Sequence, residues 1–390
     1  MTGKVGRIPG RCQFSRRHRI DAEFRLPDRA ADRYPDPLEA SILIESVGFG
    51  GAGVGRLPDG RVCFVPYTLP GERVIVRTVT EKKSYVEGEV VRLAEVSPKR
   101  VRPRCPVFGT CGGCAYQHAD YDLQLEIKTS QVVDLLRRVG GFSSIDVRPS
   151  MASPEQWEYR NRISVHVADG KTGFHHRKSR HLVPVDHCPI ANPEVNEQLA
   201  VLARRPPRGK SRFTLRSRTD HHGFRQVNEG AAGVLLEVVA GMFTGPEDHL
   251  VDAYCGAGFF SKALLPRFSK VTGIEWSEPA IAAARSTAGE SELYVQGAVE
   301  YHLASVLEGY APAQTALLVD PPSEGLAPDV ANAILSRPPG TLVYVSCDPA
   351  TLARDLKKLA GPYQIDHVQP IDMFPQTAEI EVAAVCRLRV

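Results

Sequence analysis

The sequence lacks an apolar run long enough to span a bilayer, and its first residues lack the apolar core of a signal peptide. It also lacks an internal repeat and a strong net charge, since its 390 residues carry a formal charge of +3. With 43% hydrophobic and 24% charged residues, the composition is typical of a globular protein of two or three domains. We therefore expect a cytoplasmic protein that makes no membrane contact and acts as a monomer.

The positive charge is unevenly distributed. Arg and Lys gather at residues 16–19, 99–104 and 204–218, while the last third of the chain carries many acidic residues. This asymmetry suits a basic face that binds an acidic partner such as a nucleic acid. A set of solvated charged surfaces would produce the same pattern, so charge alone leaves the two interpretations open.

Sequence texture predicts four segments. Residues 1–37 are rich in Arg, Asp and Pro and are expected to form a disordered basic extension. Short alternating runs separated by turns predict a small β-barrel over residues 38–98, with the glycine-rich stretch 48–55 as a turn or bulge. Residues 99–222 contain a cysteine cluster, a helix over 119–139 and a strand-rich region with the candidate strands RISVHV, TGFHH, HLVPV and RFTLRS. Residues 223–390 alternate strands and helices, as in a parallel α/β sheet of the Rossmann-like class. The candidate strands there are HLVDAY, KVTGIEW, ELYVQG, ALLVDPP, TLVYVSC, QIDHVQPID and EVAAVCRL.

Nine cysteines in a reducing compartment do not predict a disulfide framework. Cys105, Cys111 and Cys114 lie within ten residues, and Cys188 follows far downstream. Four thiolates can hold either a tetrahedral zinc ion or a cubane iron–sulfur cluster. Their spacing predicts a metal site and leaves zinc and iron open.

A glycine turn marks a cofactor site. The segment LVDAYCGAGFF is a strand that runs through Tyr254 and Gly256 into a helix, but Ser261 stands where a dinucleotide fingerprint has its third glycine. Glu275 ends the next strand, at the distance expected for a carboxylate that takes ribose hydroxyls. Asp320 ends a later strand at the same edge. This pattern favours S-adenosylmethionine, which has no pyrophosphate to hold.

Two further residues suggest covalent catalysis. Cys347 ends the strand LVYVS, and the following Asp348 and Pro349 turn the chain into a helix expected near Thr351. Glu381 begins the last strand. A thiol and a carboxylate at one sheet edge provide a nucleophile and a general base. Taken alone, Cys347 would more often be a buried core residue and Glu381 a surface residue.

The segments SCDPATLARDL and IDMFPQTAEIE resemble the signature motifs of the RNA uracil-5-methyltransferase family, and the resemblance extends from about residue 40 to the end. It implies that Cys347 adds to carbon 6 of a uracil and that Glu381 removes the proton from carbon 5. It also implies S-adenosylmethionine contacts for the family-matched positions Gln226, Tyr254, Gly256, Glu275 and Asp320.

The same resemblance implies a TRAM barrel that binds RNA and a 4Fe–4S cluster on the four cysteines, with zinc as the alternative. The combination of barrel and cluster is most similar to enzymes that act on large-subunit (23S) ribosomal RNA, while related enzymes act on transfer RNA. The chain departs from the family pattern at four positions. Phe259 and Asp348 stand where the family usually has Asn, Ser323 where it usually has Arg or Ala, and Glu379 where it usually has His.

Three other functions remain as alternatives. A noncatalytic RNA-binding protein would predict a damaged nucleophile or base, and neither residue is missing. A nicotinamide-dependent oxidoreductase is disfavoured by the absent third glycine, and a 5-methylcytidine enzyme by the motif that ends at Glu381.

Overall fold

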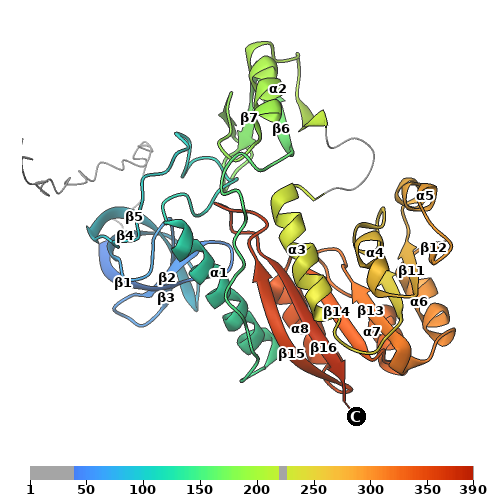
Figure 1. Ribbon diagram of the computed structural model, residues 1–390. Helices are drawn as coiled ribbons and strands as arrows, with labels where there is room; N and C mark the ends of the chain where they lie inside the picture. Colours follow the sequence, from blue (N-terminus) through green and yellow to red (C-terminus); the bar gives the residue numbers. More distant parts are fainter. Residues whose placement is uncertain (1–38, 219–225, 390) are drawn as a thin grey trace, which may run out of the picture. The chain divides into compact units, whose positions relative to one another are not determined.

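The computed structural model describes residues 39–218 and 226–389 (Figure 1). The predicted basic extension, residues 1–37, lies outside the described residues. None of the helices in the two described ranges has the length and apolar character that crossing a membrane requires.

The first five strands form a closed barrel with the order β1-β2-β3-β5-β4. Inward-facing Ile and Val side chains and one cysteine fill it, because residues two apart share a face of a strand. The predicted turn at 48–55 is half wrong, because its second half is strand β2. Gly53 allows this strand to pass close to its neighbours, since a Cβ there would lie 2.0 Å from Thr68 Oγ1. The strands are β1 (Glu39–Val47), β2 (Ala52–Arg56), β3 (Val62–Pro66), β4 (Arg73–Glu81) and β5 (Tyr85–Glu95).

The predicted helix after the cysteine cluster is present as α1 (Tyr121–Leu135), which ends in a π-helical turn over Leu136–Gly140. Asp120 caps its first turn by accepting a hydrogen bond from the Leu123 amide at 2.8 Å. A four-stranded sheet of order β8-β7-β6-β9 follows. Its strands match the predicted ones and are β6 (Arg162–Ala168), β7 (Lys171–His175), β8 (Leu182–Pro184) and β9 (Ser211–Arg216).

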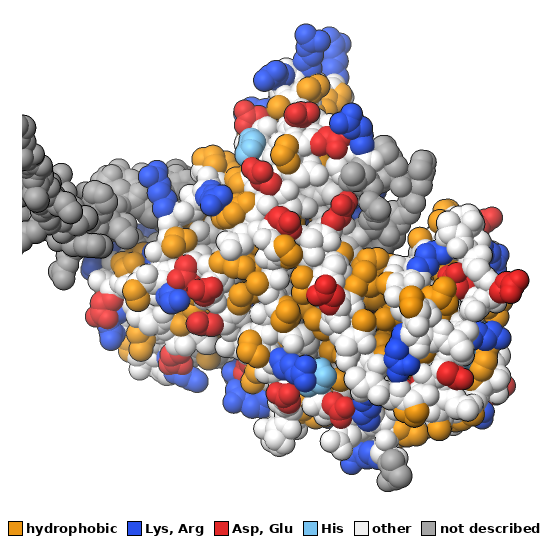
Figure 2. All heavy atoms as spheres, in the orientation of Figure 1, with side chains coloured by type: hydrophobic (Ala, Val, Ile, Leu, Met, Phe, Trp, Pro, Cys, Tyr) orange, Lys and Arg blue, Asp and Glu red, His pale blue; other side chains and the backbone are white. Residues whose placement is uncertain are grey.

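Helix α2 (Pro193–Arg204) is an addition that the strand-rich prediction missed. Asn192 caps it and Pro193 occupies its first turn, which are ordinary signals of a helix start. The helix packs on one face of the four-stranded sheet through Val195 and Leu199. At its last residue and just beyond it, Arg204, Arg205, Arg208 and Lys210 are all exposed. Figure 2 shows Lys and Arg side chains gathered at the end of this part of the molecule.

The C-terminal part is a seven-stranded sheet with helices on both faces (Figure 1). Helices α6, α7 and α8 cover one face, and α3 and α4 cover the other. The strand order is β12-β11-β10-β13-β14-β16-β15, and all seven strands occur where the sequence predicts them. They are β10 (His249–Ala253), β11 (Lys270–Glu275), β12 (Glu292–Gln296), β13 (Thr315–Val319), β14 (Thr341–Ser346), β15 (Tyr363–Ile371) and β16 (Glu381–Leu388).

The connecting helices complete this Rossmann-like layer arrangement. They are α3 (Glu229–Met242), α4 (Phe259–Leu264), α5 (Glu278–Ser286), α6 (Val299–Glu308), α7 (Pro328–Ser336) and α8 (Pro349–Leu359), with short 3₁₀ turns at Leu265–Arg267 and Pro312–Gln314.

The expectation of a purely parallel sheet is wrong at its last strand. Strand β16 is antiparallel to both β14 and β15. A parallel arrangement would need a crossover of about ten residues or more, and residues 372–380 are too few for one that includes a helix. Because β16 runs the opposite way, its first residue lies at the edge where the parallel strands end.

A buried ion pair holds the connection that leads into β16. Lys128 Nζ on α1 lies 2.6 Å from Asp372 Oδ1, and both side chains are fully buried. The same ammonium donates to the carbonyls of Phe374 at 3.2 Å and Glu379 at 2.8 Å. Burial lowers the pKa of Lys128, and the carboxylate of Asp372 acts against this shift. The ammonium thus fixes both ends of the segment 372–380.

We expect Lys128→Met to lower the free energy of unfolding by about 3–5 kcal/mol, because it leaves the Asp372 carboxylate buried without a counter-charge. Urea unfolding followed by circular dichroism measures this loss. Lys178→Met is the matched control, because it removes one charge from an exposed pair with Glu87. A loss below about 1 kcal/mol for Lys128→Met would contradict the role given to the buried pair.

Candidate active site

Three of the predicted site residues meet at one edge of the seven-stranded sheet. Asp320 directly follows β13 and Cys347 directly follows β14, while Glu381 begins β16. Ser346 pairs with Val382 in the register of β14 and β16, so the chain positions of Cys347 and Glu381 adjoin across the two strands. The antiparallel direction of β16 is therefore what brings the carboxylate beside the thiol.

The acidic groups at this edge favour protonated states. Burial, and after it the negative charges of Asp320 and Glu379, raise the pKa of Glu381 well above its ordinary value. Burial likewise raises the pKa of Asp320 to about 7. Cys347 is exposed, yet the protein around its thiol raises its pKa to about 11, and the charges of Glu381 and Asp320 act in the same direction. This edge can hold and exchange protons near neutral pH.

The segment after Cys347 explains one departure from the family pattern. Asp348 is the N-cap of α8, and its Oδ1 accepts hydrogen bonds from the amides of Ala350 at 2.8 Å and Thr351 at 2.9 Å. The helix therefore begins at Pro349, two residues before the predicted start. Asp and Asn cap helices about equally well, so Asp348 preserves the turn that presents Cys347.

The glycine turn and Glu275 form the predicted cofactor edge. Gly256 N donates to Glu275 Oε2 at 3.1 Å, and Ser277 N donates to Oε1 at 2.7 Å. Tyr254 has a φ of 68°, a left-handed conformation that is uncommon outside glycine and is often found at functional sites. A cavity of about 470 Å³ opens beside Tyr254 and is also lined by Glu300, Pro322 and Arg354.

Asp252 is a residue of this edge that the sequence analysis missed. Ser261 donates a hydrogen bond to its carboxylate at 2.5 Å, and the other carboxylate oxygen is buried without a partner among the described residues. Burial raises the pKa of Asp252 to about 7. Ser261, which replaces the third glycine of a dinucleotide fingerprint, thus has a structural partner. A lone Asp within the apolar run LVDAY was the available signal.

Two other positions named from the sequence, Gln226 and Phe259, contact residues near them in the fold. Gln226 lies beside Asn161, whose Nδ2 donates to the Gln226 carbonyl at 3.0 Å. This places its backbone next to the start of β6 rather than on the seven-stranded sheet. Phe259 is the first residue of α4, where its ring packs edge-on against Phe260 with the centroids 4.9 Å apart.

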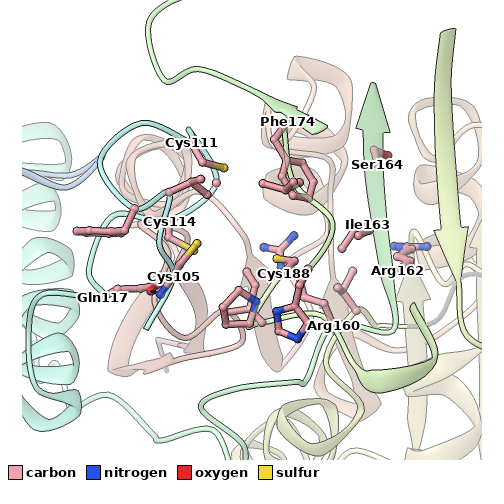
Figure 3. A pocket seen from close by; sticks show the side chains of 18 of the residues that line it. Cys105, Cys111, Cys114, Gln117, Arg160, Arg162, Ile163, Ser164, Phe174 and Cys188 are labelled. Atoms are coloured by element: carbon pink, nitrogen blue, oxygen red, sulfur yellow. Dashed lines mark hydrogen bonds between the residues drawn. The ribbon is translucent and has the colours of Figure 1, made fainter. Parts of the chain in front are cut away.

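The four cysteines of the predicted metal site line one cavity of about 490 Å³. Figure 3 shows Cys105, Cys111 and Cys114 on one loop, facing Cys188 and Arg160 across the cavity. Burial raises the pKa of all four thiols.

At least one amide group lies near each of the four sulfur atoms. Amides near each thiol oppose the effect of burial on its pKa, and they belong to Val107 and Phe108 for Cys105, Gly113 for Cys111, the Gln117 side chain for Cys114, and Ile190 and Ala191 for Cys188. Donors of this kind stabilise thiolates and bridging sulfides. The residues present therefore fit a thiolate-bound inorganic group.

The four thiols are not gathered around a single point. A tetrahedral zinc ion bound at about 2.3 Å would bring four sulfur atoms within about 4 Å of one another. Within residues 39–218 and 226–389, no group of three or more His, Cys, Asp or Glu side chains is placed to hold a metal ion.

Comparisons with known proteins agree with these features. Residues 195–294 and 303–388 match the family model described as tRNA (uracil-5-)-methyltransferase, and residues 39–91 match the TRAM domain. An uncharacterized RNA methyltransferase of Halalkalibacterium halodurans is 33% identical over 89% of this chain and 96% of its own length. One from Synechocystis is 29% identical over 89% of this chain and 95% of its own length.

A solved structure shares the fold. The tRNA (uracil-54, C5)-methyltransferase of Pyrococcus abyssi, in complex with S-adenosyl-L-homocysteine, superposes with a TM-score of 0.65 at 24% identity, covering 90% of this chain and all of that one. The order of barrel, central region and Rossmann-like sheet is thus that of a known methyltransferase architecture. The matches to the two family models and to the Halalkalibacterium halodurans relative show that the chain belongs to the S-adenosylmethionine-dependent RNA (uracil-5-)-methyltransferase family and carries its TRAM domain.

Proposed function

We propose that this enzyme methylates carbon 5 of a specific uridine in RNA through a covalent adduct between Cys347 and carbon 6 of the base. The observation that carries the proposal is the meeting of Cys347, Glu381 and Asp320 at one sheet edge, beside the glycine turn and Glu275. An unactivated pyrimidine carbon is a poor nucleophile, and covalent addition divides one difficult step into two easier ones.

The Cys347 thiol loses its proton to a neighbouring carboxylate, and the thiolate forms a bond to carbon 6. This bond opens the double bond between carbons 5 and 6 and leaves a negative charge shared by carbon 5 and oxygen 4. Carbon 5 would then take the methyl group from S-adenosylmethionine, whose sulfur–methyl bond breaks, with S-adenosylhomocysteine as the leaving group. Glu381 removes the proton from carbon 5, the bond between sulfur and carbon 6 breaks, and Cys347 returns as a thiolate.

The protonation states at this edge support those roles. The pKa of Glu381 is raised, and the pKa of Asp320 is about 7. One of these two buried carboxyl groups can therefore stay protonated, so that two negative charges need not share the same buried site. The raised pKa also makes the ionised Glu381 carboxylate a stronger proton acceptor. The uridine must be unstacked, because the nucleophile needs to reach the base.

We propose large-subunit (23S) ribosomal RNA as the substrate, on the combination of a TRAM barrel with a four-cysteine site. Transfer RNA is the second candidate, because the matched family model is described by that substrate and the Pyrococcus abyssi relative is named as a tRNA enzyme. The exposed cluster Arg204, Arg205, Arg208 and Lys210 suits either partner, since cations bind RNA phosphates without regard to sequence. Mapping 5-methyluridine in the ribosomal and transfer RNA of a deletion strain decides between them.

The four cysteines would hold a 4Fe–4S cluster, to which we assign no step in methyl transfer. Cys105, Cys111, Cys114 and Cys188 are the four ligands. The cluster would join the cysteine loop to the segment around Cys188 and so stabilise the central region.

We expect Cys347→Ala to abolish methylation and adduct formation. Glu381→Gln should trap a methylated adduct, because the carbon 5 proton then has no base to remove it. A denaturing gel with labelled RNA and S-adenosylmethionine would show a retarded band for Glu381→Gln. Glu324→Gln, which removes an exposed carboxylate near the same edge, is the control and should trap no adduct. Full activity of either main variant would overturn the mechanism.

We expect the Cys347 thiol of the free enzyme to titrate near pH 11 and to titrate lower in Glu381→Gln. Removing a negative charge beside the thiol eases formation of the thiolate, so alkylation at a fixed pH below the midpoint should become faster. Peptide mapping after timed treatment with iodoacetamide measures Cys347 separately from the other cysteines. An unchanged midpoint in Glu381→Gln would show that the carboxylate does not act on the thiol.

We expect protein purified without oxygen to be brown and to contain about four iron and four sulfide per chain. Cys188→Ser should lose most of both, because it removes one of the four ligands. Cys63→Ser is the matched control, since Cys63 is buried in the barrel and away from the cavity. Colourless wild-type protein with stoichiometric zinc would refute the cluster.

A further inference from the structure

Arg160 connects the cysteine cavity to the segment that leads into Glu381. Its backbone amide donates to the Ile190 carbonyl at 2.8 Å, and its own carbonyl accepts from the Asn192 amide at 2.9 Å. These bonds fix Arg160 to the stretch that directly follows Cys188. Arg160 is also one of the residues that line the cysteine cavity.

The side chain of Arg160 extends to the other site. Nη2 donates to Glu379 Oε2 at 3.0 Å, and the guanidinium carbon lies 5.4 Å from the centre of the Phe374 ring. Both partners belong to the segment 372–380, and Glu379 stands two residues before Glu381. One guanidinium thus contacts the beginning and the end of the segment that places the proposed base.

The same guanidinium also faces the cavity. Arg160 lines the cavity with the four cysteines and lies next to Cys188 (Figure 3). Its Nε–H is buried and has no hydrogen-bond acceptor among the described residues. A buried donor without an acceptor is costly, so a group that fills the cavity is expected to supply one. The sulfur atoms of a cluster are acceptors of that kind.

We propose that Arg160 is a positioning residue that joins the two sites: its Nε–H donates to a sulfur atom of the cluster, while its Nη2 holds Glu379 and so orients the start of β16. This inference rests on the proposed function, because it needs both the cluster and Glu381 as the base. It also gives a partner to Glu379, which stands where the family pattern usually has His.

The ion pair has an electrostatic consequence for the base. The charged and titratable groups that face Glu381 are Asp320 at the end of β13, Cys347 at the end of β14 and Glu379 on its own segment. The charge of Glu379 raises the pKa of Glu381. The positive charge of Arg160 opposes that effect. Because the Glu379 side chain is 59% exposed, solvent screens the interaction and the expected effect is modest.

The test uses the holoenzyme with three variants. Arg160→Met removes both the charge and the Nε–H, Arg160→Lys keeps a charge near Glu379 but lacks the Nε–H, and Glu379→Gln removes only the carboxylate. Lys178→Met controls for the loss of one positive charge from an exposed pair. Three readouts are needed. The pH profile of adduct resolution is measured with RNA, whereas the reduction potential and the rate of iron release to a chelator are measured without RNA.

We expect Arg160→Met to shift the pH profile upward and to slow adduct resolution roughly threefold on its acid side, because an unpaired Glu379 raises the pKa of the base. Adding Glu379→Gln to this variant should restore the profile. Both Arg160 variants should lower the reduction potential and release iron severalfold faster, because a hydrogen bond to cluster sulfur is lost. Glu379→Gln alone and Lys178→Met should leave the potential unchanged.

Each half of the proposal can fail separately. If Arg160→Lys has the same reduction potential and the same rate of iron release as the wild type, the contact with the cluster is overturned. An unchanged pH profile in Arg160→Met would overturn the link to the base. If wild-type enzyme forms no 5-methyluridine, the proposed function fails, while the potential still decides whether Arg160 meets the cluster. Wild-type protein without iron overturns the cluster and this inference together.

Discussion

The buried ion pair between Lys128 and Asp372 is the constraint on which the active site depends. Removing two charges from water is costly, and here the ammonium is compensated by one carboxylate and two backbone carbonyls. Such a site tolerates little displacement, because any movement leaves a buried charge unpaired. The segment 372–380 is therefore held by α1, an element more than 240 residues earlier in the chain. Glu381, which directly follows, is placed by that distant contact.

The antiparallel direction of β16 determines which groups meet at the active site. In a wholly parallel sheet, the start of a strand lies at the edge opposite the ligand site. Because β16 is antiparallel to β14, its first residue lies beside the residue that ends β14. Two carboxyl groups and one thiol then share a partly dry edge. In addition to the effect of burial, the charge of Asp320 raises the pKa of Glu381, and both carboxylates raise the pKa of Cys347. The direction of β16 therefore contributes to the protonation states as well as to the geometry.

Structural features that depend on a short local pattern can be predicted from the sequence alone. Strands that end in a polar residue were found because a short apolar run followed by Asp or Cys is visible in the chain, as at Asp320 and Cys347. The direction of β16, helix α2 and the roles of Lys128 and Arg160 were not predicted. The direction and the two side-chain roles depend on partners that are far apart in sequence, whereas α2 had a local signal, Asn192 before Pro193, that was overlooked. Glu381 was identified only through the family motif, since nothing in its neighbours distinguishes it from a surface residue.

Two of the four departures from the family motifs, Asp348 and Glu379, have partners within the structure. Asp348 caps α8 as Asn would, and Glu379 pairs with Arg160. Where a dinucleotide fingerprint would have glycine, Ser261 binds the buried carboxylate of Asp252. A chain that had lost its activity would be free to accumulate polar replacements without partners at these positions, since a damaged site is under no constraint to keep its turns and charges balanced. Each replacement instead meets a group of complementary chemistry. This pattern favours a working enzyme over a noncatalytic RNA-binding protein.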